Sequence, residues 1–190
     1  MMSTLRLRGG LGIAIGWVAA TLVAAPGIAA TLGTDAASSV AVKAAFLYNF
    51  AKFAEWPSLP SDAPIILCIV GDDGIAAALT ETVRGQNVGG HALEVWRPQG
   101  VTNWPNCHLL FVADAEIRRS SGGLGEIKTS PILTVSDGKG FSQATGIVEL
   151  FVEGGRMRFA INVDAAESSG LHLSSRLLGL AKVVRNGHVQ

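Results

Sequence analysis

The chain has 190 residues, with 15 basic and 15 acidic side chains and only two cysteines. The balanced charge and the lack of any Lys/Arg run exclude nucleic acid or an anionic membrane surface as the main partner. No apolar run after the N-terminal segment is long enough to span a bilayer.

The first thirty residues predict an export signal. Arg6 and Arg8 give a positive start, and the apolar run over residues 11–25 is shorter than the roughly 20 residues of a membrane-spanning helix. Small alanines after the run offer a cleavage site. We therefore expect residues 1–30 to be a cleaved signal peptide and residues 31–190 to form one secreted or periplasmic domain, of a size that suits a single core. A retained N-terminal anchor is the alternative.

The segment from Val40 to Pro57 predicts an amphipathic helix that Pro57 ends. Large apolar residues recur on one helical face: Val42, Phe46, Phe50 and Phe53. A second row carries a hydroxyl group and charges: Tyr48, Lys52 and Glu55. We expect the first row to pack against a sheet and the second row to face away from it.

Continuous apolar runs predict three strands buried on both faces, at Ile65–Val70, Cys107–Val112 and Ile132–Val135. Each is followed by a helical segment, which is typical of a parallel sheet. Paired glycines between alternating segments predict hairpins at Gly89-Gly90 and Gly154-Gly155.

Leu173, Leu177, Leu180 and Val184 recur at helical spacing, so we expect a closing helix over Leu171–Val184. Together, these elements predict a single α/β domain. Its sheet is mixed and mostly parallel, flanked by helices, with a C-terminal hairpin and the closing helix.

Asp72, Asp114 and Asp137 each follow a predicted strand, where α/β proteins place ligands. Three carboxylates there would suit Mg²⁺ or a small ligand, so a small-molecule-binding domain or a Mg-dependent hydrolase is one hypothesis. The competing interpretation, which we favour for Asp72, is a cap on the following helix. No nucleophile elbow, phosphate-binding loop or H-E-x-x-H motif occurs. We expect no enzyme, cofactor or resident metal.

The two cysteines, Cys68 and Cys107, both lie in strand-like runs. In an exported protein an even cysteine count favours a disulfide. Two buried, reduced thiols that act as small hydrophobes are the alternative.

Several segments resemble the YfiR family of periplasmic regulators. The similar pieces are KAAFLYNF at 43–50 with Trp56-Pro57, LCIVGD at 67–72, CHLLF at 107–111, RFAIN at 158–162 and GLHLSSRLL at 170–178. The combination of the first and last pieces is specific, because no general requirement of folding places both in one small exported domain.

The resemblance implies a non-enzymatic protein that inhibits an inner-membrane diguanylate cyclase by binding its periplasmic region. It further implies a homodimer, and sequestration by an outer-membrane-associated lipoprotein. Cys68 and Cys107 are similar to a redox-sensitive pair of the family, but the second pair of some members is absent here.

We expect the partner to bind at the row of Tyr48, Lys52 and Glu55, together with Arg176 in the C-terminal segment. Ordinary solvated faces would explain the same four residues.

Overall fold

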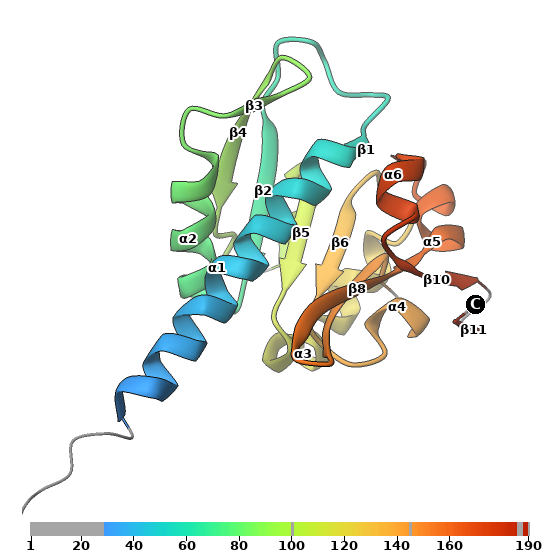
Figure 1. Cartoon of the computed structure of the whole chain (residues 1–190). Helices are drawn as coiled ribbons and strands as arrows, with labels where there is room; N and C mark the ends of the chain where they lie inside the picture. Colours follow the sequence, from blue (N-terminus) through green and yellow to red (C-terminus); the bar gives the residue numbers. More distant parts are fainter. Residues whose placement is uncertain (1–28, 100, 145, 186–187, 190) are drawn as a thin grey trace, which may run out of the picture.

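A mostly parallel sheet runs through the molecule and carries its core (Figure 1). The computed structural model describes residues 29–99, 101–144, 146–185 and 188–189. The strands of the main sheet lie in the order β11-β10-β8-β7-β6-β5-β2-β4-β3. Their bounds are β2 Ile65–Val70, β3 Asn87–Val88, β4 His91–Trp96, β5 Leu109–Val112, β6 Leu133–Ser136, β7 Val148–Glu153, β8 Arg156–Asn162, β10 Lys182–Arg185 and β11 His188–Val189.

The central strands β2, β5 and β6 are the three predicted from continuous apolar runs. Their pairings with each other are parallel, and β5 and β6 are buried at every residue. Strands buried on both faces favour apolar residues along the whole strand rather than only at alternate positions. The predicted α/β class with a mixed, mostly parallel sheet is therefore confirmed.

Helices cover both faces of the sheet. On one face lie α1 (Ala29–Phe53) and α2 (Asp73–Val83). On the other face lie the 3-10 helix η1 (Val101–Asn106), α3 (Asp114–Glu126) and α4 (Phe141–Ala144). Two short helices near the C-terminal end, α5 (Val163–Ser168) and α6 (Ser175–Leu178), pack beside α1 and β10. None of the described helices is both long and apolar enough to cross a membrane.

Both predicted hairpins are present. Gly89 and Gly90 have φ of 59° and 92°, and Gly154 and Gly155 have φ of 57° and 72°. Two-residue turns with positive φ at both positions match the twist of the strands that they join, and glycine reaches that conformation without strain.

The first helix is longer at its N-terminal end and shorter at its C-terminal end than predicted. It stops at Phe53 because the next two residues form β1 (Ala54–Glu55), which pairs with β9 (His172–Leu173). Most of the predicted export signal, including Arg6, Arg8 and the run 11–25, lies outside the described residues. Only its last two residues, Ala29 and Ala30, are described, and they begin α1.

The closing helix over Leu171–Val184 is wrong in extent. Only Ser175–Leu178 is helical, with Ser174 as its N-cap, and β10 follows and pairs in parallel with β8. Helical spacing of leucines indicated one continuous helix, yet Leu180 is 68% exposed while Leu177 and Val184 are buried. The apolar residues on which the prediction rested therefore belong to a turn of helix and a strand.

Candidate binding surfaces and the disulfide

Cys68 and Cys107 form a disulfide that joins β2 to the segment just before β5. Their Cα atoms are 5.8 Å apart and both side chains are buried. The alternative of two reduced thiols is therefore not what the structure shows. The bridge lies in the smaller apolar layer, among Leu110, Trp104 and Phe141 on the α3 side of the sheet.

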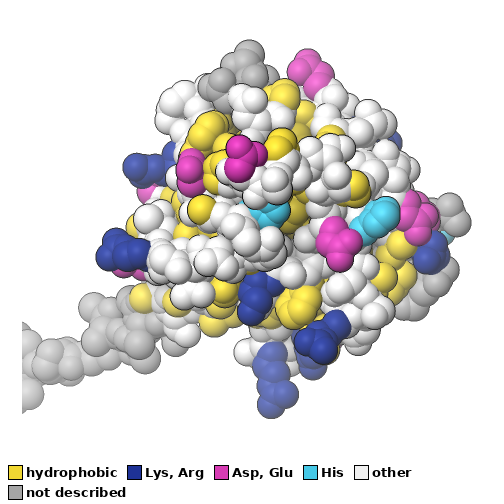
Figure 2. Space-filling model, turned by 90° about the horizontal axis from the view of Figure 1, so that it is seen from above, with side chains coloured by type: hydrophobic (Ala, Val, Ile, Leu, Met, Phe, Trp, Pro, Cys, Tyr) yellow, Lys and Arg dark blue, Asp and Glu magenta, His cyan; other side chains and the backbone are white. Residues whose placement is uncertain are grey.

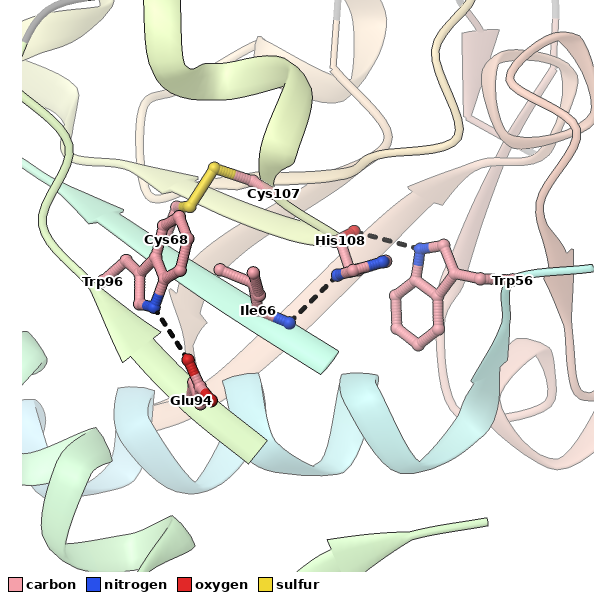
Figure 3. The surroundings of a disulfide bond; sticks show 7 residues. All are labelled: Trp56, Ile66, Cys68, Glu94, Trp96, Cys107 and His108. Carbon is pink, nitrogen blue, oxygen red and sulfur yellow. Dashed lines mark hydrogen bonds between the residues drawn. A yellow bond between two sulfur atoms is a disulfide. The ribbon is translucent and has the colours of Figure 1, made fainter. Parts of the chain in front are cut away.

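Aromatic side chains flank the bridge (Figure 3). Trp96 of β4 lies in register with Cys68, and its Nε1 donates to Glu94 at 3.1 Å. Trp104 is buried, and its indole N–H has no hydrogen-bond partner among the described residues. A buried N–H without a partner costs stability, so the apolar contacts of this ring outweigh that cost.

His108, next to the bridge, ties β2 and Trp56 to β5. Its Nδ1 accepts from the backbone N–H of Ile66 at 3.0 Å, and its backbone carbonyl accepts from Trp56 Nε1 at 3.1 Å. Partial burial lowers the pKa of His108, and the nearby His91 lowers it further. The neutral ring, which can accept at Nδ1, is the form that this contact requires.

Two of the three strand-end aspartates have structural roles. Asp72 caps α2, since its Oδ1 accepts from the Ile75 backbone N–H at 2.9 Å. Asp137 pairs with Lys43 of α1 and accepts from the Asp114 backbone N–H. Among the described residues, no group of three or more His, Cys, Asp or Glu side chains could hold a metal ion. The hydrolase hypothesis therefore lacks the acidic cluster that it requires.

The predicted partner row lies along one side of α1 and continues into β1. Lys52 Nζ sits 5.3 Å from the centre of the Tyr48 ring, and Tyr48 donates to Gln86 at 3.2 Å. Lys52 and Glu55 border a hollow of about 320 Å³ beside the β3–β4 hairpin. Arg176 is exposed on α6, and no described interaction joins it to the other three. The partner-binding role of all four stays a prediction.

The apolar stripe of α1 lines a groove instead of being wholly buried. Phe50 is buried, but Phe46 and Phe53 are half-buried and Val42 is 38% exposed. The side chains that face the sheet and α2 most closely are smaller on average, and include Ala44, Leu47 and Ala51.

This aromatic groove has a volume of about 370 Å³, and its lining is overwhelmingly apolar: Val42, Ala45, Phe46, Asn49, Phe50, Phe53, Phe159, Leu177 and Leu180. Phe159 of β8 packs edge-on against Phe46 and Phe50, at 5.7 and 5.1 Å between ring centres. The groove thus joins α1 to β8 and α6. The one signal of this groove in the sequence was the presence of three phenylalanines on a single helix, which is more aromatic surface than one buried helix face needs.

Elsewhere on the surface the charges are mixed. Seen from above, Lys/Arg and Asp/Glu side chains are scattered among apolar patches, and neither sign covers that face (Figure 2). The viewed face therefore carries no extended patch of a single charge.

One comparison with known proteins gives a match. A family profile described as YfiR/HmsC-like matches residues 40–182, which is most of the chain and nearly all of the described domain. No curated protein matches the chain. The match includes both cysteines, the whole aromatic groove and all four predicted partner residues.

Proposed function

Because the chain belongs to the YfiR/HmsC-like family, whose members are periplasmic regulators, we propose that it is a non-enzymatic periplasmic inhibitor of an inner-membrane diguanylate cyclase. The family match over residues 40–182 is the observation that carries the proposal. Inhibition needs no chemistry from this chain. It requires only that the chain bind the inactive state of the cyclase sensor more tightly than the active state.

The aromatic groove supports a binding role and is the surface to which we assign the cyclase. Binding energy at protein interfaces concentrates where a few large apolar side chains enter well-packed pockets. The groove provides such a pocket between Phe46, Phe53 and Leu180. The sensor region would insert an apolar or aromatic side chain there, and the exposed Lys52 and Arg176, which do not line the groove, would add polar contacts outside it.

The disulfide supports a redox-dependent supply of the inhibitor. The bridge closes a loop of 39 residues, and a loop of that length stabilises a fold by about 4 kcal/mol in the chain-entropy account. Since domains are stable by only about 5–15 kcal/mol, its reduction would lower the folded fraction and relieve inhibition.

The test is the cellular level of cyclic di-GMP in a deletion strain that carries either the natural chain or a variant. We expect deletion to raise that level and the natural chain to restore it. Leu180→Asp places a charge in the groove, and Val152→Asp places one at an equally exposed residue on β7; these side chains are 68% and 67% exposed. Leu180→Asp should fail to restore the level, whereas Val152→Asp should succeed.

An unchanged cyclic di-GMP level on deletion, with no cyclase recovered among membrane proteins bound to the chain, would overturn the proposal. Equal behaviour of the two Asp variants would reject the groove as the binding surface. The same recovery experiment, performed on an outer-membrane fraction, tests the second proposed partner, a lipoprotein that sequesters the regulator.

A further inference from the structure

Strand β4 has an open backbone edge. Its hairpin partner β3 pairs with it only through Asn87–Ala92 and Val88–His91. On the other side, β2 pairs with β4 as far as Trp96. Within the part of the chain that the structure describes, no strand lies along the outer edge of β4 beyond Ala92. Such an edge is a template for the addition of another strand.

The backbone groups of Leu93 and Val95 point to this open edge. His91 pairs with Val88 across the two-residue turn, so its N–H and C=O point toward β3, away from β2. The direction of these groups repeats every second residue along a strand, which gives Leu93 and Val95 the same orientation.

The side chains of β4 also alternate. Leu93 and Val95 are half-buried against the core on the α1–α2 face. Glu94 and Trp96 lie on the opposite face, next to the disulfide, and Trp96 remains 39% exposed. An indole is a large apolar surface to leave in water at the edge of a sheet.

There is room beside this edge for another chain. A hollow of about 500 Å³ lies between α2 and β4, lined by small residues of α2 such as Ala77 and Thr80 together with Val95. Glu81 and Arg97 border the same hollow, so each copy brings one charge of each sign.

We infer that the occupant is a second copy of this chain, whose β4 adds antiparallel to the open edge and makes one sheet continuous across a two-fold axis. The axis passes between Val95 and Val95 of the second copy. In that register Leu93 lies opposite Arg97 of the second copy, and Glu94 lies opposite Trp96 of the second copy. The two-fold axis repeats both pairs on its other side. About six backbone hydrogen bonds would form.

The charges and the existing ladder select this register. If Glu94 lay on the axis instead, two carboxylates would face each other, which destabilises a strand pair. That register would also use His91, whose backbone already pairs with β3. With Val95 on the axis, the indole N–H of Trp96 meets a carboxylate, the same type of acceptor that Glu94 offers it within one chain.

The side chains of β4 are complementary to those of an antiparallel copy of the same strand. Glu94 and Trp96 lie two residues apart on one face, so reading the strand in the opposite direction places each against the other. This pattern favours a second copy over an unrelated strand, and it does not depend on the proposed cyclase. An isologous contact of this kind closes after two copies.

Cross-linking tests the axis. The described residues contain no free cysteine, so Val95→Cys introduces one thiol at a position where the two Cα atoms would lie about 5.5 Å apart. Under mild oxidation of the purified chain we expect a covalent dimer with a 95–95 link by peptide mapping. Val152→Cys, equally conservative and four strands away in the sheet, is the collision control. Equal cross-linking of the two variants, or none with Val95→Cys, overturns the inference.

Charge exchange tests the register. Trp96→Glu places a carboxylate opposite Glu94 of the second copy and should weaken dimerisation about tenfold in analytical ultracentrifugation. The double variant Glu94→Lys with Trp96→Glu should recover most of the natural affinity. Both side chains are exposed, and a thermal melt verifies that each variant is folded. A monomeric natural chain, or a dimer insensitive to Trp96→Glu, contradicts the inference, as does a 95-linked product that contains a different protein.

Discussion

The two faces of the sheet are stabilised by different means. On the α1–α2 face, a large apolar cluster that includes Leu47, Phe50 and Leu79 provides the main core. On the α3 face, a smaller cluster surrounds the Cys68–Cys107 bridge and includes a Trp104 indole without a hydrogen-bond partner. The face with less apolar burial is the one that holds the covalent cross-link.

The comparison has a physical basis. Each buried Å² of apolar area contributes roughly 25 cal/mol, so a small cluster stabilises its layer less than a large one. The α3 helix contributes little to its own formation, because it contains three glycines and no large apolar stripe. A bridge between β2 and β5 holds that layer without requiring more apolar residues.

Truncation of the larger core should have the greatest effect. Phe50→Ala removes a buried ring and should lower the free energy of unfolding by about 3–5 kcal/mol, measured by urea denaturation. The matched control Phe53→Ala lies half-exposed in the aromatic groove and should cost clearly less. Equal losses would mean that the groove is as much a part of the core as the sheet-facing side of α1.

Removal of the bridge should have the next largest effect. Cys68→Ala combined with Cys107→Ala, or reduction of the natural chain, should lower the free energy of unfolding by about 2–4 kcal/mol. Thermal melts with and without reductant measure it, and the double Ala variant should not respond to reductant. A melting midpoint that is the same for oxidised and reduced chain would break the contrast between the two faces and remove the redox part of the proposed function.

Loss of a helix cap should be smaller. Asp72→Ala removes the acceptor for the Ile75 N–H and should cost about 1 kcal/mol in urea denaturation. Asp73→Ala, a neighbouring carboxylate in the first turn of α2 without that bond, should cost less than half as much. If the Asp73 variant loses as much, the charge rather than the cap is what stabilises α2.

The smallest effect concerns pH. Because burial lowers the pKa of His108, the unfolded chain takes up this proton at higher pH than the folded chain does. Stability should therefore fall as the pH drops below about 6.5, the ordinary pKa of histidine. His108→Asn keeps an acceptor for Ile66 but does not titrate, so its stability should decline less between pH 7 and pH 5. Identical pH profiles would exclude His108 as the cause.

Local patterns were sufficient for most of the fold. Continuous apolar runs identified the three central strands because most positions of a strand buried on both faces are apolar. Paired glycines identified both hairpin turns because few other residues adopt positive φ. The C-terminal segment could not be assigned in this way, because leucines at helical spacing do not reveal that the following residues pair with β8.

The surfaces were predictable only in part. Cys68 and Cys107 could be paired as the only two cysteines, but the aromatic groove could not be foreseen, because it requires α1, β8 and α6 to meet. The strand-end aspartates follow equivalent strands, yet a cap and an ion pair with Lys43 occupy Asp72 and Asp137. The cap on Ile75 is local and could be predicted, whereas Lys43 lies 94 residues from Asp137 along the chain.

Local composition and backbone preference were enough to reveal which family the chain resembles, which segments form the central sheet and which residues turn its hairpins. The tertiary structure decided which side of α1 packs closely, which phenylalanines remain accessible and which edge of β4 stays open. Those features depend on long-range contacts, where small residues such as Ala44 allow close approach and a two-residue strand such as β3 leaves its neighbour uncovered.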